Sequence, residues 1–373
     1  MNTAVRVIRA PQGLPRAEDF SIGTAEVRQP RDGEVLFRAS LLAIDPSARR
    51  RLPASDGRPG PLGAVAGIGG IVLAGVSPPQ AGLDGALVGE VVASRHPEFV
   101  PGDLVRGGNT WQVFHTFRGE YLDLLEPRPG FQLEAELGVL GRPGFVAYCG
   151  LHFAAKLEAG MTVVISAAGG AVGMVAGQLA ALAGARVVGI ASGDKVAYVV
   201  DELGLADCID RTNETITAGL ARTCPEGVDL YFDNAGGETL AAVFEQLNDF
   251  GQVVVCGMAS EYNGAEADFG PPLRPVLRKR LKIQGFVVYD HYEHYPRYRE
   301  WALEQLDAGR LRYRVDVVDG LENAPRALAN VLTGRNRGRQ LVQLGPLPHV
   351  LGQRTRQGTQ PDTVVGETEG VSA

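Results

Sequence analysis

The chain has 373 residues, of which 45% are hydrophobic and 21% are charged. This composition supplies a large buried core, and the length is more than one domain usually takes, so we expect two domains. The formal net charge of -7 offers no basic surface for nucleic acid or for an anionic membrane, and neither partner is expected.

The N-terminal part reads as short strands separated by glycine and proline turns. Residues 1–10 alternate like a strand, and further strand-like runs lie at 35–39, 89–93 and 103–105. The segment 69–87 is rich in glycine and proline, which predicts a surface loop or an extra hairpin. Together these features predict an irregular, barrel-like domain. Because the first ten residues do not form the charged and apolar regions of a signal peptide, we expect a cytoplasmic protein.

Strand-like residues 162–166 lead into a glycine-rich turn, and a helical run rich in alanine and leucine leaves it. A strand, a tight turn and a helix are the context of the dinucleotide-binding fingerprint. Gly170 and Gly173 stand at its second and third glycine positions, where small residues let a pyrophosphate approach the amides of the helix N-terminus. Ala168 replaces the first glycine, so ordinary packing of a helix on a strand is an alternative explanation of the turn.

The same region carries no charge from 159 to 185, a length that would suit a membrane span. The run breaks at Gly169 and Gly170 and is followed by more strands and helices, so we favour a buried strand–helix unit. We predict strands at 162–166, 186–190, 228–232, 252–256 and 282–288, and helices near 171–183, 195–203, 213–222 and 238–247. This alternation predicts a parallel, doubly wound α/β sheet. We expect the folded part to end with helices near 297–309 and 323–333 and strands at 313–318 and 340–344.

The four cysteines are too far apart for a metal-binding or redox C-x-x-C site. We expect free thiols that pack as small buried side chains at Cys149, Cys208, Cys224 and Cys256.

A series of short motifs runs along the chain: Leu42–Pro46, Ser94–Pro97, Gly141–Tyr148, the glycine-rich turn, Tyr231–Gly237, Cys256–Asn263 and Gln284–Val288. In this order, from about residue 5 to 344, they resemble the zinc-independent medium-chain dehydrogenase/reductases of the leukotriene B4 12-hydroxydehydrogenase, prostaglandin reductase and alkenal double-bond reductase group. The resemblance implies a Rossmann sheet inserted into a GroES-like β-barrel domain that the end of the chain completes. It also implies a homodimer and the NADPH-dependent reduction of a carbon–carbon double bond conjugated to a carbonyl.

The resemblance divides the chain into three parts. Residues 1–145 and 313–345 are expected to form the GroES-like substrate domain, and 146–312 the Rossmann domain that binds NADPH. The tail at 346–373 has little apolar sequence to bury and is expected to be disordered.

A choice of NADPH over NADH is also readable from the residues. Binders of NAD usually place an acid at the end of the second strand for the ribose 2′-hydroxyl, and residues 186–193 offer none. Lys195, one of only four lysines, stands just beyond them, where the family carries its 2′-phosphate lysine. Arg211 stands where relatives often carry tyrosine; it is expected either to contact the adenosine and its phosphate or to be an ordinary surface residue.

The resemblance extends the cofactor site along the rest of the chain. The residues it implies are Ala168, Gly170, Ala171, Val172, Gly173, Asn234, Cys256, Gly257, Met258, Tyr262, Phe286, Val287, Val288 and Asn336.

Metal-free catalysis is expected, because the chain has Ile44 and the sequence Gly63–Val65 where zinc-dependent relatives carry ligands, and it lacks their cysteine cluster. An enolate formed without metal needs hydrogen-bond donors, and Tyr262 is the candidate acid, either alone or with the cofactor ribose.

Ser47, Ala64 and Tyr262 are expected to line the substrate pocket, which departs from the family at two positions. Ser47 follows the Asp-Pro pair where relatives have tyrosine, and Ala64 stands where they often have glutamate. Loss of a phenol and a carboxylate predicts a wider, less polar entrance and a bulky enone or enal, for instance a biosynthetic intermediate. Residues 291–295, with two histidines and two tyrosines, are expected at the surface or at a dimer contact.

Three alternatives remain on the same scaffold. They are a quinone reductase, an allylic alcohol dehydrogenase, and a catalytically idle protein that binds NADPH.

Overall fold

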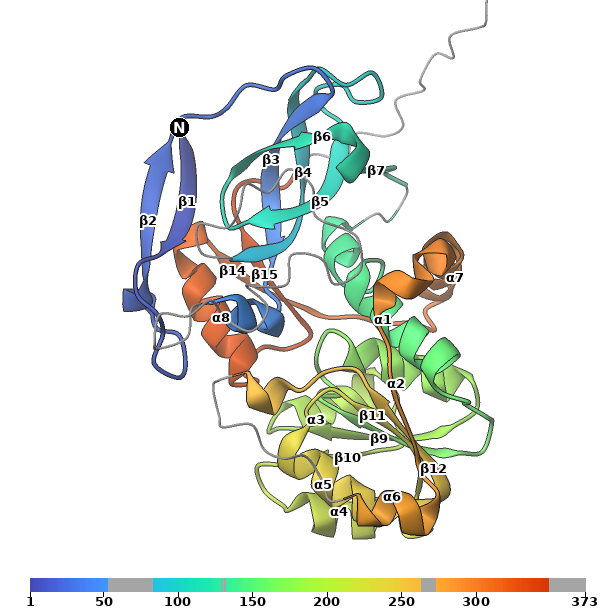
Figure 1. Ribbon diagram of the computed structural model, residues 1–373. Helices are drawn as coiled ribbons and strands as arrows, with labels where there is room; N and C mark the ends of the chain where they lie inside the picture. The colour runs from blue at the N-terminus through green and yellow to red at the C-terminus, as the bar shows by residue number, and fades with distance from the viewer. Residues whose placement is uncertain (53–82, 129, 131, 263–272, 349–373) are drawn as a thin grey trace, which may run out of the picture.

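The computed structural model describes residues 1–52, 83–128, 130, 132–262 and 273–348. Figure 1 shows two bodies, one holding the N-terminal strands together with the last helix and strands of the chain, the other holding a parallel sheet with helices around it. Ala64 and most of the segment 346–373 fall outside the described residues. None of the helices in the described ranges is long and apolar enough to cross a membrane.

Six parallel strands form one sheet in the order β10-β9-β8-β11-β12-β13. They are β8 (Thr162–Ser166), β9 (Arg186–Ala191), β10 (Asp207–Asp210), β11 (Val228–Asp233), β12 (Leu247–Val255) and β13 (Lys282–Gly285). The order reverses its direction between β8 and β11, which is the point where ligands bind in doubly wound sheets. The predicted Rossmann sheet is therefore confirmed.

Strand β8, in the middle of this sheet, is buried on both faces. Val163 and Ile165 belong to one apolar core cluster, and Val164 belongs to another on the opposite face. This alternation follows from the two-residue period of a strand, and a parallel sheet with helices on both sides needs it. The helices between the strands are α2 (Gly173–Leu182), α3 (Lys195–Ala197), α4 (Ile216–Thr223), α5 (Gly237–Gln246) and α6 (Arg274–Lys279).

The second body is a mostly antiparallel sheet in the order β14-β15-β3-β4-β5-β7, with β6 paired to β3. Its strands are β3 (Glu34–Ala43), β4 (Asp84–Ser94), β5 (Leu104–Thr110), β6 (Phe114–Arg118), β7 (Asp123–Leu125), β14 (Val315–Asp319) and β15 (Arg339–Gln343). The end of the chain completes the N-terminal sheet, because Leu341 of β15 pairs with Ala43 of β3. A separate hairpin-like pair consists of β1 (Asn2–Val7) and β2 (Phe20–Ala25).

Three helices lie along the boundary of the two bodies or on the barrel. They are α1 (Arg142–Cys149), α7 (Tyr295–Asp307) and α8 (Ala324–Leu332). In α1, a Cβ on Gly144 would lie 2.1 Å from the Tyr298 hydroxyl, so only glycine lets α1 approach α7 this closely.

Several boundaries differ from the prediction. The segment 69–87 was expected to be a loop or hairpin, but its last residues, from Asp84, belong to the long strand β4. The strand expected at 282–288 ends at Gly285, and the strand expected at 252–256 begins at Leu247. Sequence patterns also missed α1, α6 and β10, since each is short and carries prolines or charges at its ends.

Candidate active site

The glycine-rich turn joins β8 to the first turn of α2. The Gly170 amide donates to the carbonyl of Ala167 over 2.9 Å, and Ala167 itself adopts a positive φ of 50°. A Cβ on Gly173 would lie only 2.3 Å from the Ala167 carbonyl oxygen. The third glycine of the fingerprint is therefore a steric requirement of this turn.

The missing first glycine has a local explanation. Ala168 is fully buried, and its Cβ faces Gly189 in β9, where a second Cβ would lie 2.8 Å away. The methyl group of Ala168 fills the space that Gly189 leaves, so the turn keeps its shape. Ala171 and Val172, which precede α2, are half-buried, and the first turn of a helix supplies amides without intrahelical acceptors.

Asn234 ties the loop after β11 to the strand that carries the glycine turn. Its side-chain amide donates to the Ser166 carbonyl over 2.8 Å, and its backbone amide donates to the Ser166 hydroxyl over 2.8 Å. The two loops meet at the carboxyl ends of β8 and β11, where the sheet order reverses. The predicted residue therefore lies at the expected ligand-binding edge.

Two cations lie beside the glycine turn. Lys195 is 9% exposed, and its methylenes pack on Gly169, where a Cβ would lie 3.1 Å from the lysine Cδ. Arg211, after β10, is exposed. Burial lowers the pKa of Lys195, the charge of Arg211 lowers it further, and Asp316 opposes both effects. Among the described residues, none accepts a hydrogen bond from the Lys195 ammonium, so the pair suits a bound anion.

Asn336 lies on a segment that closes over the same turn. It is 8% exposed, and its side-chain amide donates to the Gly338 carbonyl over 2.8 Å. The Gly338 amide in turn donates to the carbonyl of Gly169 over 2.9 Å. An ion pair between Arg337 and Asp194 joins this segment to the loop that carries Lys195.

Residues 256–258 and Tyr262 form the next part of the site. The amides of Cys256 and Gly257 donate to the Asp233 carbonyl at the end of β11. Cys256 is half-buried, and burial raises the pKa of its thiol to about 12. Met258 is 40% exposed. A Cβ on Gly257 would lie 3.7 Å from the Tyr262 hydroxyl, so the phenol lies directly beside the predicted cofactor residues.

Tyr262 also contacts the other body of the molecule. The Arg50 guanidinium lies over its ring, 5.8 Å from the centroid. Burial raises the pKa of the Tyr262 phenol, whereas a backbone hydrogen bond from Met258 and the charge of Arg50 oppose the rise.

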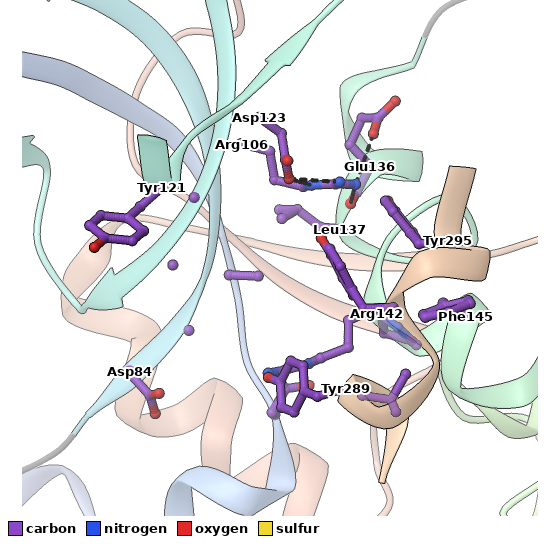
Figure 2. A pocket seen from close by; sticks show the side chains of 18 of the residues that line it. Asp84, Arg106, Tyr121, Asp123, Glu136, Leu137, Arg142, Phe145, Tyr289 and Tyr295 are labelled. Carbon is purple, nitrogen blue, oxygen red and sulfur yellow. Dashed lines mark hydrogen bonds and ion pairs between the residues drawn. The ribbon is translucent and has the colours of Figure 1, made fainter. Parts of the chain in front are cut away.

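A cavity of about 700 Å³ opens between the two bodies (Figure 2). Ser47, a predicted pocket residue, and Val288, a predicted cofactor contact, line it. Tyr262 was also expected to line the substrate pocket, but it is not among the described residues of this wall. Phe286 and Val287, which precede Val288, are half-buried. Phe286 packs against Gly150, where a Cβ would lie 3.1 Å from its ring.

One expectation about this region is wrong. Tyr292 and Tyr295 were expected at the surface or at a dimer contact, but Tyr295 is buried and lines the cavity. Tyr292 also lines the cavity and is 42% exposed. Their rings stack with centroids 5.3 Å apart, and the Tyr295 hydroxyl donates to the Leu140 carbonyl over 2.6 Å. The pattern of four polar aromatic and imidazole side chains is typical of a surface, but Tyr295, at the start of α7, is buried.

The arginines of the cavity wall are paired with acids. Arg142 donates to Asp45 over 2.6 Å, and the nearly buried Arg339 donates to the other oxygen of Asp45 over 2.5 Å. These contacts hold the pKa of Asp45 well below its usual range although burial raises it. Arg106 donates to both Asp123 and Glu136, as the dashed lines in Figure 2 show.

Asp45 and Arg142 stand within two of the sequence motifs, but nothing in the sequence gives either residue a role or singles out Tyr289. Asp45 and Arg142 are separated by 97 positions, and only an observed contact reveals their pairing. In the described part of the chain, no group of three His, Cys, Asp or Glu side chains is placed to hold a metal ion. All four cysteines are free, three of them buried and Cys256 intermediate.

Two family profiles match the chain. The profile described as "Zinc-binding dehydrogenase" matches residues 171–306, and the one described as "N-terminal domain of oxidoreductase" matches residues 4–78.

Individual proteins are similar over nearly the whole chain. The NADPH-dependent curcumin reductase of Escherichia coli (strain K12) is 35% identical over 90% of this chain and 94% of its own. The NADP(+)-dependent 2-alkenal reductase of Nicotiana tabacum is 33% identical over 89% and 94%. The crystal structure of CurA from Vibrio vulnificus in complex with NADPH is similar with a TM-score of 0.79 and 32% identity, over 92% of this chain and 99% of that one.

Proposed function

This chain belongs to the medium-chain dehydrogenase/reductase superfamily, in the group of the curcumin, alkenal and prostaglandin reductases, and we propose that it reduces a carbon–carbon double bond conjugated to a carbonyl with NADPH. The observation that carries the proposal is the cavity of about 700 Å³. Val288, one of the predicted cofactor residues, lies in its wall. The named activities of the relatives support the same reaction.

The turn and the cations suit an NADPH molecule along the carboxyl edge of the parallel sheet. The glycine turn is free of side chains where a pyrophosphate would bind, and Lys195 and Arg211 would hold the 2′-phosphate. The residues proposed for the remaining contacts are Ala168, Gly170, Ala171, Val172, Gly173, Asn234, Cys256, Gly257, Met258, Tyr262, Phe286, Val287, Val288 and Asn336.

NADPH, when bound, supplies a hydride with its electron pair to the β-carbon of the substrate. The protein's task is then to stabilise the negative charge that moves to the carbonyl oxygen and to deliver a proton to the α-carbon. Tyr262 is the residue proposed to act as the acid. Its position beside Gly257 and beneath Arg50 supports a role next to the cofactor.

The substrate is proposed to be a bulky enone or enal. Ser47 borders the cavity and provides no bulk there, unlike the tyrosine of relatives. The proposed contribution of Ala64 concerns a residue outside the described ranges.

A substrate panel tests the function. At fixed NADPH, aryl and alkyl enones, quinones and allylic alcohols are compared by kcat/KM. Turnover is expected to be highest with enones. Preference for quinones, or for oxidation of allylic alcohols with NADP, would replace the proposed reaction with one of these two activities. Binding of NADPH without turnover of any compound would identify a catalytically idle protein.

We further propose a homodimer in the cytoplasm, in which the parallel sheet is the contact. Strand β13 forms the edge of its sheet and all its residues are exposed, with Ile283 at 41%. Leu273, just before α6, and Leu277, within it, are 72% and 82% exposed. Exposed apolar side chains and an open sheet edge favour pairing with another chain. We also propose that the substrate domain and the Rossmann domain meet at 145/146 and at 312/313. Light scattering of Leu277→Glu should give the monomer mass.

A further inference from the structure

A chain of three side chains leads from the barrel to the floor of the cavity. Arg142 at the start of α1 donates to Asp45 over 2.6 Å and approaches the Tyr289 hydroxyl with its other terminal nitrogen, 3.4 Å away. Figure 2 shows Arg142 reaching the Tyr289 ring. All three residues line the cavity.

The direction of these hydrogen bonds follows from the chemistry of the groups. A guanidinium only donates, so the Tyr289 oxygen accepts from Arg142 and its own O–H remains able to donate. Within the described ranges, no side chain or carbonyl accepts a hydrogen bond from Tyr289. The free donor therefore belongs to the wall of the cavity.

The position of the phenol is fixed from behind. Asp45 is held on both oxygens, by Arg142 and by Arg339, whose side chain is 3% exposed. Such a supported arrangement costs little reorganisation when charge develops beside it. Tyr289 also follows directly after Val288, a predicted cofactor contact that borders the same cavity.

We propose that Tyr289 donates a hydrogen bond to the carbonyl oxygen of the enone, with Arg142 as its positioning residue. The inference rests on the proposed function. As hydride bonds to the β-carbon, the double-bond electron pair forms the new bond between the α-carbon and the carbonyl carbon, and the carbonyl pair moves to oxygen. Tyr289 stabilises that enolate oxygen. The α-carbon then takes a proton from Tyr262 or water as the carbonyl re-forms, and a phenolate so produced is reprotonated by solvent.

Steady-state kinetics on full-length variants test the assignment. Tyr289→Phe should lower kcat for an enone about 10²- to 10³-fold, the usual effect of losing one oxyanion donor, while KM for NADPH and Tm stay near the wild-type values. Tyr313→Phe is the matched control, since its phenol donates to Gln132 outside the cavity, and it should keep wild-type kcat. Unchanged kcat in Tyr289→Phe would overturn the proposal.

A double-mutant cycle tests the role of Arg142. Arg142→Met should lower kcat in the wild-type background but have little further effect in Tyr289→Phe, because both changes remove one interaction. Losses that multiply would contradict positioning through Tyr289.

A shape-conserving substitution covers the case in which a variant fails to fold. Replacing Tyr289 with 3,5-difluorotyrosine should shift the pH profile of kcat to lower pH, and an unchanged profile would overturn the proposal. If wild-type protein turns over no enone, the proposed function itself fails, which is a different outcome from wild-type turnover that ignores Tyr289.

Discussion

Lys195 and Arg211 direct their positive charges toward the same glycine. A Cβ on Gly334 would lie 3.9 Å from the Lys195 ammonium and 3.4 Å from an Arg211 terminal nitrogen. Burial lowers the pKa of Lys195, and the nearby charge of Arg211 lowers it further. An anion between them would relieve this repulsion, which supports the proposal that the pair holds the 2′-phosphate.

Removing Lys195 should therefore affect one cofactor more than the other. Lys195→Ala is expected to raise KM for NADPH about 10- to 100-fold, as for a lost hydrogen bond to a charged group of about 1.5–3 kcal/mol, with little effect on KM for NADH. Lys156→Ala is the control, because Lys156 is exposed and pairs with Glu158. Equal effects on both cofactors would remove the 2′-phosphate assignment.

The glycine turn should tolerate no side chain at 173. Gly173→Ala places a methyl group against the Ala167 carbonyl oxygen and is expected to cost about 1–3 kcal/mol of unfolding free energy. Gly345→Ala is the control, since a Cβ there meets nothing within 4 Å. Thermal unfolding of the two variants compares them, and equal Tm values would contradict the steric account.

Much of the fold follows from local patterns. Strand–helix alternation predicted the parallel sheet, because β-branched runs such as 162–166 and alanine-rich runs such as 171–183 have different periods. The pairing of β15 with β3 could not come from these patterns, since it joins residues almost 300 positions apart, and only the family resemblance implied it.

The candidate site was only partly predictable for the same reason. Lys195 could be noticed because lysine is rare in this chain. The contact of Asp45 with Arg142 and the places of Tyr289 and Tyr295 in the cavity wall depend on how α1, the turn at 288–294 and α7 pack. No spacing in the sequence encodes that packing.

The stability of the folded protein should fall in mild acid because of the buried histidine His115. Its ring is 1% exposed, stacks on Phe37 and bonds the Gln112 carbonyl through Nε2, and burial lowers its pKa to about 4 from 6.5. Between pH 6.5 and about 4, the unfolded chain binds a proton at His115 that the folded chain does not. The stabilisation that neutral His115 gives the folded protein is therefore complete above pH 6.5 and is lost as the pH falls to about 4.

The shift corresponds to about 3 kcal/mol. Urea unfolding at pH 7 and pH 4.5 should show a smaller loss in His115→Phe than in wild type, even if the variant is less stable at pH 7. The same loss in both proteins would remove His115 as the cause.

Catalysis should not need zinc. The sequence offers no ligand at Ile44 or at 63–65, so metal analysis of purified protein is expected to find no stoichiometric zinc, and chelators should leave kcat unchanged. Zinc in equal amount to protein, with loss of activity on its removal, would contradict metal-free enolate stabilisation.

The most direct test of the proposed reaction follows the hydride itself. An enone is reduced with NADPH carrying deuterium at the transferable C4 position, and the product is analysed by NMR. The expected product is a saturated ketone with deuterium on the β-carbon and solvent hydrogen on the α-carbon. Deuterium on the carbonyl carbon of an allylic alcohol product would contradict it.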